Sequence, residues 1–310
     1  MNKEKTEIFA IWLCKPGTYM MPYLYEMCIC TWQVMNPDYD VVIYSNNVDL
    51  KFNFLSKDTT KVKIIDECFP GLEDEAKKII GEDVPEGMRF AHRSDYIRYK
   101  IVSSILGIYI DADLMCISPI EDLINECKEK GQYVIMAKED KIRIGNAFMT
   151  CLNEEGRAYY RDILDNYVNN YIKTSYTFNS IKYPMLINHR YSNMVRVLEM
   201  KDGFFYPNWE FNENGDVGML KEKECPLHSY GVHLYNSDHK WKEFREELER
   251  DLFQTNNPWW IQQHLNNCIL KYIDLMKNAE QRKLNTDERL YQSILTNYGK
   301  DYANKFKEED

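Results

Sequence analysis

The chain has 310 residues, of which 44% are hydrophobic and 28% are charged, and its formal net charge is −10. A chain of this length can bury a sizeable core, as one large α/β domain or as two small ones. The acidic balance argues against a nucleic-acid-binding protein, because phosphate backbones are bound by clustered lysine and arginine, and against attachment to anionic lipid through the whole surface. No apolar run reaches the roughly 18 residues of a transmembrane helix, so only a peripheral membrane contact is expected.

Cysteine usage and the N-terminus favour a cytoplasmic protein. The nine cysteines, an odd number, include no C-x-x-C pair, and Cys28 and Cys30 have a spacing that suits neither a zinc knuckle nor a disulfide. Basic residues precede an apolar run near the N-terminus, but no small-residue cleavage site follows. This run is therefore predicted to be a strand rather than a signal peptide. Reduced and mostly buried thiols are expected.

The first predicted elements form a β-α-β unit. Glu7–Leu13 is predicted to be a strand, and Pro22–Met35 a helix, because apolar residues recur in it at helical spacing. Pro37 ends that helix, since proline disfavours helix in the residue before it, and Tyr39–Tyr44 is the next strand. Strand, helix and strand at this spacing indicate a parallel sheet. A minor strand is expected at Val62–Ile65.

The stretch from residue 90 to residue 122 carries the most specific pattern in the chain. Isoleucines recur every four residues from Ile97 to Ile105, which predicts a helix with one buried face. Gly107 is expected to end this helix, and Ile108–Ile110 is predicted to be a short buried strand. Asp111 and Asp113 follow that strand directly, at the position where open α/β sheets bind ligands.

The two aspartates predict a metal site that also holds the phosphates of a nucleotide. Carboxylate oxygens are hard ligands of the kind that Mg²⁺ or Mn²⁺ prefers. On the preceding helix, Asp95 and Arg98 are three residues apart and therefore share a face. An acidic turn after a strand is the alternative explanation of Asp111 and Asp113, because a D-x-D pair by itself is a weak signal.

The whole stretch resembles the sugar-nucleotide-dependent glycosyltransferases with a D-x-D motif, in particular family 32. That group includes capsular polysaccharide enzymes and the yeast initiating mannosyltransferase, and the glucosylating domains of the large clostridial toxins are related to it. The residues that match its motifs are Ala91, Ser94, Asp95, Arg98, Gly107, Tyr109, Asp111 and Asp113. Leu106 stands where the family often has a second glycine. The resemblance implies a GT-A-like (Rossmann-like) nucleotide-sugar-binding sheet flanked by helices.

The resemblance also implies roles for donor-binding residues. Trp12 matches the tryptophan of the family's first strand, which stacks on the base of the donor. Asp95 and Arg98 match residues that hold the donor's ribose and sugar hydroxyls. Tyr109 belongs to the matched strand, and Asn146 matches an asparagine that can face the donor sugar. From the residues alone, Trp12 fits a core aromatic equally well, and Asn146 a turn-stabilising residue.

Residues 230–241 resemble the family's closing motif, which supplies a further metal or phosphate contact from a loop over the donor. His233 aligns with the histidine of that motif and is an expected metal ligand, although a lone histidine on a strand is also a common core residue. Ser237 is an expected donor contact and His239 a further expected metal ligand, with Asp238 as the alternative to both. The sequence does not rank these three, because the tryptophan that ends the motif comes later here than in the family.

The rest of the chain is less specific. Ser118 is expected to cap the helix after the aspartates, and strands are predicted at Tyr133–Ala137 and Ala147–Cys151. Residues 1–241 are predicted to form the GT-A-like glycosyltransferase domain and residues 242–310 a helical C-terminal extension. Helices of the extension are predicted at Phe244–Phe253, Trp259–Met276 and Asp287–Thr296. The extension is interpreted as a brace for the sheet, with an oligomer contact or an acceptor site as alternatives.

Together these features predict an enzyme, a metal-dependent hexosyltransferase that moves a sugar from a nucleotide sugar to a saccharide or glycolipid acceptor. The resemblance favours a UDP-sugar over a GDP-sugar, retention of the anomeric configuration, and a role in surface polysaccharide synthesis. The alternatives are a glycosyltransferase that modifies protein, a non-catalytic module that binds carbohydrate or nucleotide sugar, and a phosphotransferase with Asp111 as its nucleophile. Met115 argues against the last, because D-x-D-x-T phosphatases have threonine at that position.

Overall fold

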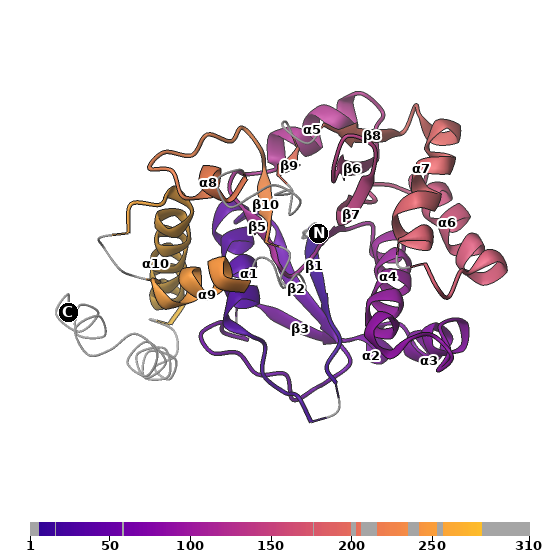
Figure 1. Ribbon diagram of the computed structural model, residues 1–310, viewed down its shortest axis with the longest axis horizontal. Coiled ribbons are helices and arrows are strands. Elements are labelled where there is room, and N and C mark those ends of the chain that lie inside the picture. Colours follow the sequence, from indigo (N-terminus) through magenta and orange to yellow (C-terminus); the bar gives the residue numbers. More distant parts are fainter. Residues whose placement is uncertain are drawn as a thin grey trace.

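A seven-stranded sheet organises the molecule (Figure 1). The computed structural model describes residues 6–15, 17–57, 59–175, 177–199, 203–205, 216–234, 242–252 and 257–280. The strand order is β3 (Lys61–Ile64), β2 (Asp40–Ser45), β1 (Glu7–Trp12), β4 (Ile108–Ile110), β7 (Ile144–Thr150), β6 (Val134–Lys138) and β8 (Val195–Leu198). All neighbours are parallel except β7, which is antiparallel to both β4 and β6. The predicted α/β class, with a mostly parallel sheet flanked by helices, is confirmed.

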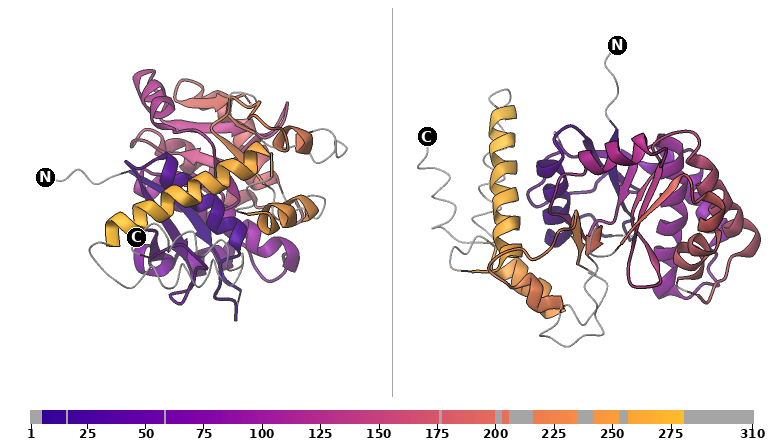
Figure 2. Two further views of the ribbon diagram at one scale, coloured as in Figure 1. Left: turned by 90° about the vertical axis from the view of Figure 1, so that its left-hand side faces the viewer. Right: turned by 90° about the horizontal axis from the view of Figure 1, so that it is seen from above.

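Helices cover both faces of the sheet, and the alternation along β1 shows how the two faces are divided. Ile8 and Ala10 belong to a core shared with α1 (Tyr23–Met35) and α10 (Trp260–Glu280), whereas Phe9 belongs to a core shared with α4 (Glu86–Ile105) and α6 (Arg157–Asn170). Alternate side chains of a strand point to opposite faces, so β1 contributes to both layers. Figure 2 shows α10 outside α1 on one side of the sheet, and α4 and α6 on the other.

A second, smaller sheet lies beside the first. It has the order β5 (Leu114–Cys116), β10 (Gly231–His233) and β9 (Phe204–Phe205), with β10 antiparallel to β5 and parallel to β9. The remaining helices in the described residues are α2 (Ile65–Cys68), α3 (Leu72–Ile79), α5 (Glu121–Glu129), α7 (Tyr183–Ile187), α8 (Asp216–Leu220) and α9 (Lys242–Arg250), with a π-helical turn at Phe178–Lys182 and a 3₁₀ turn at Asn188–Tyr191.

Helix α10, the last helix in the described part of the chain, packs on α1 and on the segment after β2. Cys30 Sγ donates to the carbonyl of Cys268 at 3.7 Å, and the hydroxyl of Tyr272 accepts from the backbone N–H of Ser56 at 2.9 Å. The predicted helices at Phe244–Phe253 and Trp259–Met276 correspond to α9 and α10, whereas the one at Asp287–Thr296 lies outside the described residues. The domain boundary at residue 241 stays a prediction. Within the described part of the chain, no helix combines the length and apolarity needed to cross a membrane.

Two predictions about local structure were wrong, and tertiary contacts explain both. Gly107 was expected to end α4, but the residue that ends it in the left-handed conformation is Leu106, with φ of 52°. Gly107 is needed for another reason, because a Cβ there would lie 3.0 Å from the carbonyl oxygen of Glu7 on β1. Ser118 does not cap a helix: the N-cap position of α5 is Ile120, no side chain caps that helix, and the Ser118 N–H donates to the Tyr230 carbonyl at 3.2 Å, beyond the end of the β5–β10 ladder. Helix α5 starts later, at Glu121.

Replacement of buried Glu26 is expected to destabilise the fold. Its carboxylate accepts hydrogen bonds from the backbone N–H groups of Asn53, Phe54 and Leu55 at 2.7, 2.9 and 3.1 Å, and from the Asn53 amide at 2.6 Å. Burial raises the pKa of Glu26, and these donors oppose the rise. Glu26→Gln turns one acceptor into a donor that faces N–H groups, so the free energy of unfolding should fall by about 1–3 kcal/mol in urea titrations. Glu67→Gln, on the exposed side of α2, is the control and should be neutral.

Candidate active site

Asp111 and Asp113 lie at the carboxyl end of β4, next to the antiparallel strand β7. The Asp111 N–H donates to the carbonyl of Ala147 on β7 at 2.7 Å, and the Asp111 carbonyl accepts from the Leu114 N–H at 3.0 Å. The backbone therefore turns sharply between β4 and β5, and both carboxylates are held at this edge of the main sheet. Open α/β sheets bind ligands at such an edge, where the strand direction changes.

The small sheet brings His233 to the two aspartates. His233 on β10 pairs with Leu114 on β5, and the next residue, Leu234, donates its N–H to the carbonyl of Asp113 at 3.0 Å. His233 Nε2 lies 3.4 Å from Asp111 Oδ2 and 3.3 Å from Asp113 Oδ1. One potential ligand atom from each of the three residues lies within 4.8 Å of the others. Two carboxylates and an imidazole are a donor set that can hold a divalent metal ion.

Arg98 on α4 links the aspartates to the helix behind them. Its Nη1 lies 2.9 Å from Asp111 Oδ1 and donates to the Asn146 carbonyl at 3.1 Å, and its Nη2 lies 3.3 Å from Asp95 Oδ1. The guanidinium also lies over the Tyr109 ring, 4.6 Å from the centroid, and the Tyr109 hydroxyl donates to Asp111. Arg98 is only 7% exposed, so these contacts occur in a largely dry setting where they are strong.

The charges of the cluster are set by this network. Burial would raise the pKa of Asp111, but Arg98 and the hydrogen bonds from His233 and Tyr109 outweigh burial and lower it to about 2. Burial lowers the pKa of His233, yet Asp113 and Asp111 together raise it to about 10. Asp95 differs from Asp111, because burial dominates over Arg98 and raises its pKa to about 6. The His233 proton and a divalent cation therefore compete for the same two carboxylates.

Most of the residues selected from the sequence converge here. The cluster itself consists of Asp111, Asp113 and His233. The layer that supports it consists of Arg98, Asp95, Tyr109 and Asn146. Within this layer, the Asn146 amide donates to Asp95 at 2.9 Å. Trp12 lies at the end of β1 on the α1 side of the sheet, with its ring 4.6 Å from that of Tyr25. Ser237 and His239 lie outside the described residues, as does Asp238.

A cavity that the sequence did not indicate opens near this edge. It has a volume of about 250 Å³ and lies where β1 and β2 end, between α3 and α4. Leu13, Asn46, Phe90 and Arg93 contribute to its lining. Leu13 directly follows Trp12 but points to the α4 side, which is also the side of Asp95 and Arg98. The one signal in the sequence is that Asn46 follows the second strand of the β-α-β unit.

Comparison with known proteins adds a family match. Residues 23–130 match the family described as "Glycosyltransferase sugar-binding region containing DXD motif". The matched span includes α1, α4 and the pair Asp111 and Asp113, but ends before Asn146 and His233. A search of the curated proteins found no significant match.

Several solved glycosyltransferase structures are similar to the chain at low identity. Mouse xyloside xylosyltransferase 1 has 10% identity and a TM-score of 0.44, over 75% of this chain and 98% of the other. Glycosyltransferase GlyE from Streptococcus pneumoniae has 11% identity and a TM-score of 0.46, over 89% of this chain and 64% of the other. Galactosyltransferase LgtC in complex with donor and acceptor sugar analogues has 9% identity and a TM-score of 0.44, over 84% of this chain and 94% of the other.

The family match and the geometry agree on one class of protein. The matched region contains the D-x-D motif for which the family is described, and in the structure its two carboxylates meet a histidine at the carboxyl edge of the sheet. Residues 23–130 therefore match a DXD-containing sugar-binding region of glycosyltransferases, in agreement with the glycosyltransferase predicted from the sequence.

Proposed function

We propose that the protein is a metal-dependent glycosyltransferase of the family 32 type, in which Asp111, Asp113 and His233 hold a divalent cation, Mn²⁺ or Mg²⁺. The cluster of these three side chains carries the proposal, because it lies in the region that matches the glycosyltransferase family or pairs directly with it. A bound cation supplies Lewis-acid neutralisation of the departing diphosphate. Arg98 keeps Asp111 ionised and fixed in position, so that the carboxylate is ready as a ligand.

The donor is proposed to be a nucleotide sugar, with a UDP-sugar favoured over a GDP-sugar by the resemblance to family 32. Its sugar and ribose are assigned to the side where Asp95, Arg98 and Asn146 meet, with Tyr109 behind them and Ser237 as a further contact. The supporting observation is that the Asn146 amide and Arg98 both hold the carboxylate of Asp95, which keeps one acceptor group fixed beside the aspartate pair. A fixed acceptor of this kind suits sugar hydroxyls, which donate hydrogen bonds.

The base of the donor is proposed to stack on Trp12. Calorimetry with UDP in Mn²⁺ should therefore show that Trp12→Ala weakens binding by about 1 kcal/mol or more, the scale of an aromatic stacking contact. Phe90→Ala is the matched control, since Phe90 lines the cavity on the other side of β1. A loss of affinity in Phe90→Ala but not in Trp12→Ala would place the base in that cavity instead. GDP binding with no response to UDP would overturn the choice of nucleotide.

The acceptor is proposed to be a saccharide or glycolipid, with retention of the anomeric configuration and a role in surface polysaccharide synthesis in the cytoplasm. A protein acceptor and a non-catalytic carbohydrate-binding module are the alternatives. Release of UDP from a panel of UDP-sugars, with water or an added saccharide as the acceptor of the sugar, is measured with Mn²⁺ and with EDTA to test the class. Metal-dependent release supports the transferase, and binding without release to any of these acceptors supports the module. Labelled donor offered to lipid-linked saccharides or to whole-cell protein separates the acceptors, because label found in protein alone would refute the saccharide.

A further inference from the structure

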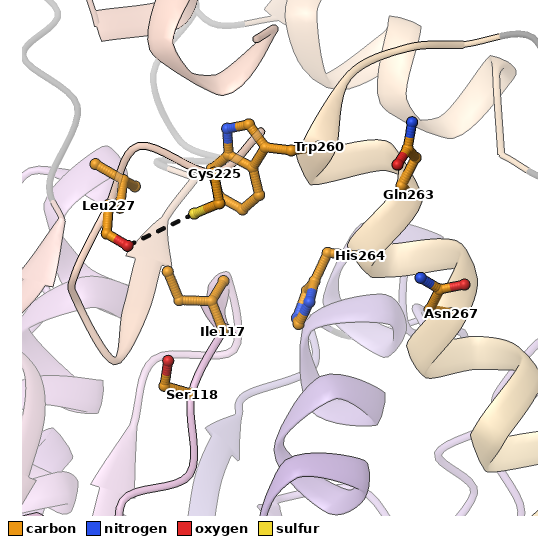
Figure 3. Close-up of a pocket in the computed structure, with 8 residues that line it drawn as sticks. All are labelled: Ile117, Ser118, Cys225, Leu227, Trp260, Gln263, His264 and Asn267. Carbon is orange, nitrogen blue, oxygen red and sulfur yellow. Dashed lines mark hydrogen bonds between the residues drawn. The ribbon is translucent and has the colours of Figure 1, made fainter. Parts of the chain in front are cut away.

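A second cavity lies on the opposite end of the β5–β10 ladder from the aspartates. It has a volume of about 360 Å³ and is an open depression bordered by the end of β5, the segment before β10, and the N-terminal half of α10 (Figure 3). Ile117 is four residues beyond Asp113, which corresponds to roughly 13 Å of extended strand. The volume falls within the range of about 300–1,000 Å³ that is typical of small-molecule sites. The cavity is therefore separate from the candidate metal site and large enough for a ligand.

The polar part of the cavity is formed by neutral groups from α10. Gln263 and Asn267 are one turn apart and both exposed, and His264 lies between them along the chain. His264 Nε2 lies 2.7 Å from the carbonyl of Cys116, so Nε2 is the protonated nitrogen and Nδ1 is an acceptor. Burial lowers the pKa of His264, which keeps the ring neutral at pH 7. Two amides and a neutral imidazole offer both donors and acceptors without a net charge.

The rest of the lining is apolar and is held in place. Ile117, Leu227 and Trp260 surround the polar groups, and the indole N–H of Trp260 donates to the carbonyl of Met219 at 2.7 Å. The Trp260 ring is therefore fixed, and because it is only 5% exposed it closes the wall of the cavity rather than offering an open ring face. None of the lining side chains drawn in Figure 3 carries a formal charge at pH 7. A charged ligand such as a nucleotide diphosphate would find no counter-charge here, whereas a neutral ligand with hydroxyl groups and apolar C–H faces would match both parts of the lining.

We propose that this cavity binds one unit of a neutral saccharide, at a distance from the reaction centre. The inference rests on the proposed function and extends it, because it assigns an acceptor-chain contact to helix α10. Hydroxyl groups would pair with Gln263, Asn267 and His264, while the C–H face of the sugar would lie on Ile117 and Leu227, the partly exposed apolar residues of the lining. A transferase that holds its growing saccharide at a second point keeps that chain bound between successive transfers.

Cys225 allows the site to be tested directly, because its thiol is exposed and lines this cavity. In the full chain, with EDTA and no donor, alkylation of Cys225 by N-ethylmaleimide is measured with an array of neutral and acidic oligosaccharides. We expect a neutral oligosaccharide to slow the reaction of Cys225 about tenfold at ten times its Kd. Cys68, the other exposed cysteine, lies on α2 and should react at the same rate throughout. The proposal would be overturned if no neutral saccharide protected Cys225 from alkylation, or if Cys225 and Cys68 were protected equally.

Variants separate this site from the proposed active site. Gln263→Ala/Asn267→Ala should abolish the protection of Cys225 but leave binding of UDP in Mn²⁺ unchanged. Asn169→Ala/Asn170→Ala removes two exposed amides near the end of α6 and is the matched control. Asp113→Asn should retain the protection, so protection that depends on Asp113 rather than on Gln263 would refute a separate site. Protection with normal Gln263 dependence but no UDP binding would instead refute the proposed function and leave this cavity as a saccharide site.

Discussion

Asp113→Asn is expected to reduce sugar transfer by more than about 100-fold. Asparagine keeps the shape of the side chain but removes the charge of one of the two carboxylates that are proposed to hold the cation. Loss of a group that merely orients a metal ligand already costs about 10–100-fold, and loss of a ligand's charge should cost more. The measurement is donor turnover over a range of Mn²⁺ concentrations, together with the shift in melting temperature that Mn²⁺ produces. Asp122→Asn, on the exposed face of α5, is the matched control.

The stability of this variant provides a second check. Repulsion between two neighbouring carboxylates alone would make Asp113→Asn neutral or stabilising. In the structure, however, His233 Nε2 lies close to both carboxylates, so the substitution also removes a charged hydrogen-bond partner of His233. We therefore expect the free energy of unfolding without metal to fall by no more than about 3 kcal/mol, with the fold retained. Full transfer activity of Asp113→Asn in EDTA would show that the D-x-D pair does not hold a catalytic metal.

Arg98→Ala is expected to be among the most destabilising single substitutions, at about 3–5 kcal/mol. The guanidinium lies between Asp111 and Asp95 and is almost fully buried, so its removal leaves Asp95 without its cation and Asp111 with His233 as its remaining cationic partner. Urea titration measures the effect. The control is Lys61→Ala, which breaks the exposed pair of Lys61 with Asp40 at 2.7 Å and should cost no more than about 1 kcal/mol. Similar values for the two variants would show that the buried network does not stabilise the fold.

The loss of stability caused by Arg98→Ala should depend on pH, and the direction of that dependence follows from the pKa of Asp95. Burial already raises the pKa of Asp95 to about 6, so the folded protein binds this proton more tightly than the unfolded chain does. Ionisation of Asp95 therefore costs stability above pH 6, and that cost is relieved as the pH falls toward the ordinary range of an aspartate. Without Arg98 the pKa of Asp95 should rise further. The deficit of the variant relative to the wild type is expected to be smaller at pH 5 than at pH 8.

Elements that depend on local pattern were predictable from the sequence. The apolar spacing of α1 and α4 and the short apolar run of β4 identified these elements, because each pattern reports burial of a single face or strand. The end of α4 was assigned to the wrong residue, because Gly107 serves the close approach to Glu7 on a distant strand. The start of α5 was misplaced for a similar reason, since Ser118 is hydrogen-bonded to Tyr230. In both cases a contact far along the chain overrode a local preference.

In the candidate site, too, residues that are close together in the sequence were predictable, whereas contacts between distant segments were not. Asp95, Arg98, Asp111 and Asp113 could be selected together because they lie within one helix-and-strand unit. The ion pair of Arg98 with Asp111 could not be derived from spacing, because it depends on how α4 crosses β4. His233 came from resemblance rather than from any local pattern. The cavity beside α10 was absent from the sequence analysis altogether, because it exists only where α10 docks against the end of β5.

The pairing of β10 with β5 determines when the metal site can exist. His233 and Asp111 are 122 positions apart in the chain, and they meet only after this ladder closes. Closure of so long a loop is slow compared with the formation of helices, because the entropy of the intervening chain must first be lost. During synthesis the aspartates emerge from the ribosome long before their histidine does. A cation bound at the proposed site would therefore stabilise the finished protein, but the complete three-residue site is not available to guide the early folding of the main sheet.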